Sequence, residues 1–331
     1  MYLVDKLYSK IFRTLNDGVF ELGYGLSSIK KPERNIVLMY HGVDTIGGNL
    51  FNGRHTPLNY FKKQIEFLSK NYNIVSLKDY FVRCSSEKNL CCITFDDGYL
   101  NNLINALPIL EKYNTKATFF ITGINEVGVD ILWADFVNIV SKLYSKDILI
   151  GGEEFQNKKG NYFSKESKKS LMDIVKNIKP EYGFKEEIFS AFEGKIDFKE
   201  DSKYFEYWKL MNSRQIQLLA QSKCATIGSH GYYHNNLGNI LFPNAMKELS
   251  NSKKYLENLI QKEVTSIGYP DGSYSEEVCN YAASIGIIHQ TCSESFNKEE
   301  DRKNGFLKNR AGIYNFDSAA NQMYTAINAN L

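Results

Sequence analysis

The sequence lacks the features that mark several classes of protein. Its 331 residues include only six cysteines, six prolines and five histidines, and 40 Lys and Arg residues against 38 Asp and Glu leave a net charge of +2. So few cysteines exclude a disulfide scaffold, and we expect all six to be reduced. A charge this close to zero offers no basic excess, so no nucleic-acid partner is predicted. With 43% hydrophobic residues, the chain is long enough for one large α/β barrel with insertions.

The N-terminal segment, residues 1–34, resembles neither a signal peptide nor a membrane span. No stretch of the chain reaches 18 apolar residues, and charges at Asp5 and Lys6 interrupt the N-terminus, so a cytoplasmic location is expected. Apolar residues recur in this segment at helical spacing, at Leu3, Leu7, Ile11 and Leu15. We expect a helix packed on the domain. The alternative is a surface helix making peripheral contact with the inner membrane.

From residue 36 onward, short apolar runs alternate with amphipathic stretches. Strands are predicted at Ile36–His41, Cys91–Phe95, Ala117–Thr122, Ala225–Ser229, Ser266–Tyr269 and Gly286–Cys292. Helices are predicted near Leu58–Asn71, Asn101–Tyr113, Pro243–Lys262 and Ser275–Ser284. Fully apolar strands that alternate with helices predict a parallel sheet covered by helices, and the pattern leaves a barrel and a doubly wound sheet both open.

The segment 126–222 breaks this alternation. It is rich in Lys and Glu and mostly helical in character, with Gly151 and Gly152 expected to form a turn. We predict that it is an insertion forming a lid or a subdomain.

Two polar strings follow predicted strands. In Ile93–Tyr99 (ITFDDGY), a hydrophobic strand ends in the consecutive carboxylates Asp96 and Asp97. The carboxyl end of a strand is where an α/β barrel presents catalytic groups, and successive residues point to opposite sides. The two aspartates are therefore expected to have different roles, although a DDG string alone is more typical of a turn or helix cap.

The second string, Ser229–His234 (SHGYYH), carries two histidines four residues apart. If the segment forms a helical turn, His230 and His234 face the same way and can reach one ion. With one aspartate they make a two-His, one-carboxylate set that suits Zn²⁺, with Co²⁺, Ni²⁺ and Fe²⁺ as alternatives. Like these two, His41 falls at the end of a predicted strand, which favours a site over a surface pair. His55, in an Asn/Gly/Arg-rich loop, is expected to face solvent, with a position bordering the substrate cleft as the alternative.

Together, ITFDDGY, ATFFITG and SHGYYH resemble the polysaccharide deacetylase family, the NodB-homology domain of carbohydrate esterase family four. The similarity covers about residues 35–123 and 223–315. It implies that residues 35–331 form a distorted (β/α) barrel, interrupted by the mostly helical insertion. It also implies metal-dependent removal of an N-acetyl or O-acetyl group from a sugar.

The resemblance also implies roles for individual residues. It implies a metal-binding set of one aspartate and two histidines, namely Asp97, His230 and His234. Asp96 resembles the general base, and the backbone N–H of Tyr99 the donor to the oxyanion. The Tyr-Pro-x-Gly string places Tyr269 and Pro270 at the substrate.

The sequence departs from the common family pattern in two places. Many members have a late Leu-x-His motif that supplies the general acid, but no histidine follows His289 here, so we predict His41 as the acid. His41 resembles the early Tyr-His of one branch of the family; the alternative is a structural histidine. The arginine of the Arg-x-Pro motif is missing before Pro270, and Arg310 is predicted to hold Asp96 instead, with a plain surface arginine as the alternative. His289 itself is expected at a core or edge position of a strand.

These expectations combine into one function with two alternatives. We expect a cytoplasmic, metal-dependent hydrolase that removes the acetyl group from an N-acetylated amino sugar, a precursor or glycan in surface-polysaccharide biosynthesis. The alternatives are a hydrolase of the same fold acting on a non-sugar amide, and a carbohydrate-binding protein with a vestigial site. Exposed Trp133 or Trp208 lining the cleft would favour a sugar, because indole rings stack on sugar rings. The sequence does not predict the oligomeric state.

Overall fold

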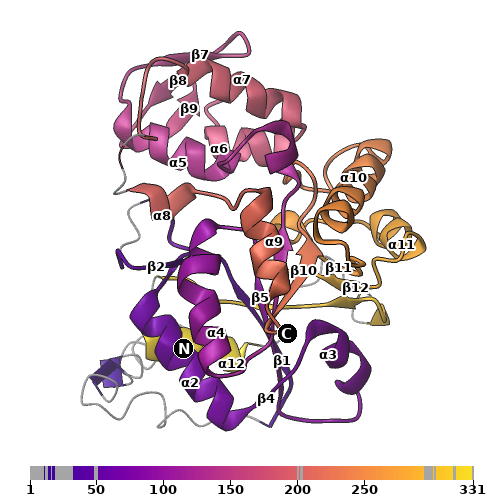
Figure 1. Cartoon of the computed structure of the whole chain (residues 1–331). Coiled ribbons are helices and arrows are strands. Elements are labelled where there is room, and N and C mark those ends of the chain that lie inside the picture. Colours follow the sequence, from indigo (N-terminus) through magenta and orange to yellow (C-terminus); the bar gives the residue numbers. More distant parts are fainter. Residues whose placement is uncertain are drawn as a thin grey trace, which may run out of the picture.

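The computed structural model describes residues 11, 14, 15, 17, 18, 33–47, 51–199, 201, 204–293, 301, 303–315 and 318–329 (Figure 1). Most of the helix predicted within residues 1–34 lies outside these residues. In the part of the chain that is described, no helix is both long enough and apolar enough to cross a membrane. All six cysteines are free thiols, as predicted.

One parallel sheet of nine strands forms the centre of the fold. Its order is β13-β12-β11-β10-β6-β5-β1-β14, with β4 paired to β5. The strands are β1 (Ile36–Tyr40), β4 (Asn73–Ile74), β5 (Leu90–Phe95), β6 (Ala117–Ile121), β10 (Ala225–Ser229), β11 (Ser266–Gly268), β12 (His289–Thr291), β13 (Leu307–Lys308) and β14 (Ala311–Gly312). The six predicted strands are confirmed. The other three are two-residue bridges, too short to produce a periodic pattern.

The two edges of this sheet are joined by a very short connection. Strand β13 lies at one edge and β14 at the other, yet only Asn309 and Arg310 separate them in the sequence. Because the chain between them can span only about 11 Å, the sheet must curl until its edges come close. The result is a half-barrel of parallel strands, which confirms the predicted distorted (β/α) barrel.

Helices cover the outside of the curled sheet (Figure 1). They are α2 (Leu58–Asn71), α3 (Leu77–Arg83), α4 (Leu107–Lys112), α9 (Ser213–Gln221), α10 (Phe242–Ile260), α11 (Glu276–Ser284) and α12 (Ala319–Asn328). Helix α2 buries Phe61, Ile65 and Leu68 along one face, the spacing expected of an amphipathic helix. The predicted helix 101–113 begins with a wide π turn, η2 (Asn102–Ala106), before α4. Strands β2 (Val43–Asp44) and β3 (Thr56–Pro57) form a separate parallel pair.

The predicted insertion, apart from its last helix α9, has its own hydrophobic core and lies at one end of the half-barrel (Figure 1). Helix α9 falls within the predicted bounds 126–222 but packs against β10 and α10, so it belongs to the barrel. The other helical elements of the insertion are η3 (Ile124–Val127), α5 (Trp133–Leu143), α6 (Leu171–Asp173), η4 (Ile174–Ile178), α7 (Tyr182–Phe192) and α8 (Phe205–Trp208). It also contains an antiparallel sheet that the sequence analysis missed, formed by β7 (Ile148–Ile150), β8 (Glu153–Asn157) and β9 (Tyr162–Ser164). The predicted turn at Gly151 and Gly152, both at positive φ, joins β7 to β8.

We expect Phe95→Ala to lower the free energy of unfolding by about 3–5 kcal/mol, because it leaves a cavity in a close-packed core. The Phe95 ring is fully buried and stacks on Phe119 of the neighbouring strand, with centroids 4.7 Å apart. Urea denaturation followed by circular dichroism measures the change. Val82→Ala on α3, where the side chain is 70% exposed, is the control and should change stability by less than about 0.5 kcal/mol. Equal losses in the two variants would contradict this account of the core.

Candidate active site

Strand β5 ends at Phe95, and the chain turns sharply over the next three residues. The N–H of Asp96 donates to Tyr40 O (3.0 Å), and the N–H of Gly98 donates back to Asp96 O (2.9 Å). Asp97 adopts a left-handed conformation with φ 75°, a strained state for a non-glycine residue that is often found at functional sites. As a consequence, the Asp96 and Asp97 carboxylates meet different partners.

The two histidines follow β10 in an irregular loop, not in the helical turn considered from the sequence. The N–H of His230 donates to Ile121 O (2.9 Å) and so continues the pairing with β6. Gly231 (φ 73°) and His234 (φ 54°) are both left-handed, and these two positions redirect the chain without a helix. The two imidazoles still come together, with ring centroids 4.9 Å apart.

Asp97, His230 and His234 form a buried set whose ligand atoms all lie within 4.8 Å of one another. Asp97 Oδ1 is 3.3 Å from His230 Nε2 and 3.2 Å from His234 Nε2. Because His230 Nδ1 lies 2.6 Å from Gly268 O, Nδ1 holds the proton and Nε2 keeps its lone pair. Neither carboxylate oxygen of Asp97 has a hydrogen-bond donor among the described residues. Buried oxygens without donors beside available imidazole nitrogens fit a divalent cation.

The charges around this set keep its carboxylate ionised. Burial alone would raise the pKa of Asp97, but His230, His234 and the Arg54 guanidinium hold it well below its usual range. Burial lowers the pKa of His234. Burial would also lower the pKa of His230, but Asp96 and Asp97 outweigh it and raise that pKa. As the pH falls, His230 is therefore protonated before His234, and its protonation is the first to compete with metal binding.

A buried arginine holds Asp96 outside the metal-ligand set. Arg310 Nη1 is 2.5 Å from Asp96 Oδ1, and Nη2 is 2.8 Å from Oδ2. The same guanidinium donates to Cys292 O (2.8 Å) and to Thr94 Oγ1 (3.2 Å), which fixes its plane. Burial alone would raise the pKa of Asp96, but Arg310 and His230 hold it below its usual range. Asp96 is thus an ionised, oriented carboxylate, the state that a general base requires.

Both aspartates open onto one cavity of about 200 Å³. His41 lies in its wall, and no hydrogen-bond partner for His41 Nδ1 is found in the described chain. Burial and the nearby Arg54 lower the pKa of His41 to about 4, so its imidazole is neutral at neutral pH. Tyr269 also lines the cavity, and its hydroxyl donates to Gln290 Oε1 (2.8 Å).

The other two predicted site residues, Pro270 and Tyr99, do not line the cavity. Pro270 begins the turn η6 (Pro270–Gly272), which presents Asp271 and Gly272 to the cavity. Tyr99 forms an antiparallel β-bridge with Leu210. The hydrogen bonds of this bridge are made by the residues on either side of Tyr99 and Leu210, so the N–H of Tyr99 takes no part in them.

Sequence reasoning missed two charged residues of the cavity and placed His55 wrongly. Arg54 Nη1 lies 3.8 Å from Asp97 Oδ2, and Asp271 lines the opening. Arg54 stands in a loop away from the end of any predicted strand. Asp271 follows the predicted strand Ser266–Tyr269 within the Tyr-Pro-x-Gly string, but only Tyr269 and Pro270 of that string were predicted at the substrate. His55 is fully buried and does not face solvent, because its ring fills the space beside Gly42, where a Cβ would lie 2.5 Å from Nε2. His289 lies in β12 and is buried, as expected.

The two tryptophans whose exposure would have favoured sugar stacking are both buried, Trp133 at 2% and Trp208 at 1% exposure. Trp208 packs in the core of the insertion. Trp133 lines a second cavity of about 210 Å³, which shares Arg54, His234 and Asp271 with the first. The insertion therefore forms a wall beside the site but offers no exposed indole ring there.

Fold and site together define an α/β half-barrel with a candidate metal centre at the carboxyl ends of its strands. Residues 84–151 and 202–288 match the polysaccharide deacetylase family. A putative polysaccharide deacetylase of Bacillus subtilis, YxkH, is 22% identical over 262 residues, which are 78% of this chain and 63% of that protein. The chain thus spans less than two thirds of this curated relative.

Two solved structures share the fold. The Streptococcus pyogenes deacetylase PplD, in complex with acetate, gives a TM-score of 0.55 at 17% identity, over 90% of this chain and 99% of that one. A de-N-acetylase from Aggregatibacter actinomycetemcomitans gives 0.53 at 16% identity, over 88% and 100%. The resemblance to the polysaccharide deacetylase family is thus confirmed over residues 84–151 and 202–288.

We expect metal affinity to fall as the pH drops through and below the raised pKa of His230, because an imidazolium cannot bind the ion. Isothermal titration of the metal-free protein with Zn²⁺ between pH 5.5 and 8 should show a plateau at high pH. Below it, the affinity should fall about tenfold per pH unit for each proton displaced. An affinity that is independent of pH, or a profile unchanged in His230→Ala, would contradict this assignment.

Proposed function

We propose that this chain is a metal-dependent deacetylase that removes the acetyl group from an N-acetylated amino sugar. One observation carries the proposal: two consecutive carboxylates lie in different surroundings beside one cavity. Asp97 Oδ1 lies 3.3 and 3.2 Å from the two imidazole nitrogens, whereas both oxygens of Asp96 are bonded to Arg310 and Asp96 Oδ2 is 4.0 Å from His230 Nε2. A site that only bound carbohydrate would have no use for an ionised carboxylate held outside the metal-ligand set.

Asp97, His230 and His234 are the residues that would hold the ion, with Zn²⁺ as the first candidate. When bound, a divalent ion would supply Lewis acidity toward the acetyl carbonyl and lower the pKa of a water. Co²⁺, Ni²⁺ and Fe²⁺ suit the same mixed nitrogen and oxygen ligands.

The remaining steps fall to residues of this chain. Asp96 accepts the proton of the attacking water while Arg310 keeps its carboxylate oriented. The Tyr99 N–H donates to the oxygen that becomes negative. His41 is neutral before the reaction; it takes up the proton that Asp96 removed from the water and passes it to the leaving nitrogen as the C–N bond breaks. The products are acetate and a free amino sugar.

Polar surface next to the cavity favours a sugar as the substrate. A larger opening of about 550 Å³ shares Asp271, Gly272 and Ser293 with the cavity. Hydroxyl and amide groups line much of it, from Asn177, Asn236, Asn239, Ser273 and Tyr274 among others. Such groups can hydrogen-bond the hydroxyls of a saccharide and orient it. We infer a precursor or glycan of surface-polysaccharide biosynthesis as the substrate, in the cytoplasm.

One observation favours the second candidate, hydrolysis of a non-sugar amide. The cavity at the aspartates is only about 200 Å³, and neither Trp133 nor Trp208 is exposed to stack on a sugar ring. A small amide would fit this volume without using the polar opening.

The deciding experiment measures acetate release from N-acetylated amino sugars by metal-stripped protein resupplied with Zn²⁺ or Co²⁺. Asp96→Asn should lower kcat by about 10²–10⁴-fold, because the general base is lost. His230→Ala should abolish metal-dependent release, with His289→Ala as a matched control outside the site. Metal-dependent release from small amides but from no sugar would transfer the assignment to the second candidate. Tight metal binding without any release would indicate a vestigial site.

Arg310→Lys should lower kcat by at least about tenfold and leave the metal stoichiometry unchanged. A lysine ammonium cannot make the two parallel hydrogen bonds that orient Asp96, and the substituted residue does not contact the metal set. Steady-state kinetics and metal analysis of the same preparation separate the two effects. Wild-type kcat in this variant would show that Asp96 needs no oriented partner.

A further inference from the structure

A lysine of the insertion reaches the loop that carries both histidines. Lys185 on α7 is only 1% exposed, and its Nζ donates to the main-chain oxygen of His234 (3.0 Å) and to Asn235 Oδ1. An ammonium group is rarely buried unless hydrogen bonds and opposite charge offset its lost hydration. Here the groups that receive it belong to the loop next to the metal-ligand set.

A buried glutamate of the barrel holds the same loop from the other side. Glu248 on α10, 4% exposed, accepts hydrogen bonds from the N–H groups of Tyr232 (2.6 Å) and Tyr233 (2.8 Å). It also accepts one from Asn235 Nδ2 (2.6 Å), so Asn235 lies between Lys185 and Glu248. The loop is thus held by hydrogen bonds from two buried side chains, Lys185 of the insertion and Glu248 of the barrel.

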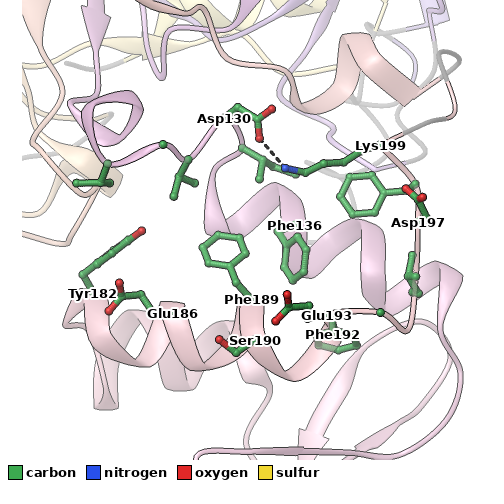
Figure 2. Close-up of a pocket in the computed structure, with 17 residues that line it drawn as sticks. Asp130, Phe136, Tyr182, Glu186, Phe189, Ser190, Phe192, Glu193, Asp197 and Lys199 are labelled. Atoms are coloured by element: carbon green, nitrogen blue, oxygen red, sulfur yellow. Dashed lines mark hydrogen bonds and ion pairs between the residues drawn. The ribbon is translucent and has the colours of Figure 1, made fainter.

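Helix α7 makes a second contact with this loop. Tyr182, one turn before Lys185, stacks on Tyr233 with ring centroids 4.2 Å apart and planes within 17°. Tyr182 also lines, with Glu186 and Phe189 of α7, a separate cavity of about 560 Å³, which Figure 2 shows. Lys185 does not line that cavity, so its two hydrogen bonds to the loop are a distinct feature of the helix.

The conformation held in this way is one that His234 would not adopt by itself. Its φ of 54° is strained for a residue with a β-carbon, and such a residue stays there only where its surroundings hold it. The His234 main-chain oxygen is the atom that Lys185 holds, and His234 Nε2 lies 3.2 Å from Asp97 Oδ1. The lysine contact therefore acts on the backbone that orients this imidazole.

We propose that Lys185 is a positioning residue for His234, and that the insertion thereby sets the affinity of a metal centre whose three ligands all come from the barrel. The proposal rests on the function proposed above. It gives the segment 126–222 a role as a support for the metal-bearing loop. The same contact makes the folding of the insertion a condition for tight metal binding.

The test compares metal binding by Lys185→Met and the unaltered protein. Methionine keeps most of the side-chain volume but leaves His234 O and Asn235 Oδ1 without the ammonium donor. We expect the dissociation constant for Co²⁺ to rise about 10–100-fold, as for other groups that orient metal ligands. The visible absorption of the Co²⁺-loaded protein should also change, because the ligand geometry changes. Lys179→Met, the same substitution at an insertion lysine that pairs with Glu153, should leave both readouts unchanged.

Thermal unfolding of the metal-free proteins separates positioning from mere stabilisation. A Co²⁺ dissociation constant within twofold of the unaltered value, with an unchanged spectrum, would overturn the proposal even if the melting temperature falls. If Lys185→Met does not fold, Tyr182→Leu provides the test. It removes the stacking contact and should weaken Co²⁺ binding in the same direction, whereas unchanged binding would again overturn the proposal.

His230→Ala distinguishes this failure from failure of the proposed function. Loss of Co²⁺ binding in His230→Ala beside unchanged binding in Lys185→Met would refute only the role of Lys185. Unchanged binding in His230→Ala would show that the ion does not use the three-residue set, and would refute both proposals together.

Discussion

The buried pair of Arg310 and Asp96 is the interaction on which the arrangement of the site depends. Arg310 lies in the two-residue connection between β13 and β14, the opposite edges of the sheet, and Asp96 follows the central strand β5. Removing one partner of such a pair typically destabilises a protein by about 3–5 kcal/mol, because it leaves an uncompensated buried charge. The pair therefore links the curled edges of the sheet to its centre, and the same contact orients the candidate base.

This constraint also explains how two adjacent carboxylates differ. Asp96 has both oxygens engaged by one guanidinium. The oxygens of Asp97 lack hydrogen-bond donors among the described residues, and its Oδ1 lies beside two imidazole nitrogens. The left-handed backbone at Asp97 sets this difference within one peptide unit. A strained residue is tolerated here because the neighbouring strands and the arginine fix the turn on both sides.

Two kinds of feature could be predicted from the sequence: elements with a periodic hydrophobic pattern, and polar residues that directly follow a predicted strand. The six strands were recognisable as apolar runs because they are largely buried on both faces of the sheet. Helix α2 was recognisable because it buries one face, which leaves a periodic pattern of apolar residues. The turns bearing Asp96 and His230 were found because each follows such a strand. Arg54 and Lys185 could not be found in this way, because each reaches the site from a loop or from the insertion and only the folded chain brings it near the strand ends. Asp271 does follow a predicted strand, Ser266–Tyr269, but it was missed because it stands as a single polar residue between Pro270 and Gly272.

The relation between insertion and barrel follows from where the two touch. As the chain leaves the insertion, the N–H of Met211 donates to Gly98 O and Lys209 O accepts from the N–H of Leu100, so this segment flanks the turn that bears Asp97. From α7, Lys185 holds the loop that bears His234. Both ligand-bearing turns thus rest on a unit with its own hydrophobic core. An irregular turn has few hydrogen bonds of its own, so its geometry is only as rigid as the structure packed against it. The barrel supplies the ligands, and the insertion supplies part of the rigidity that keeps them in place.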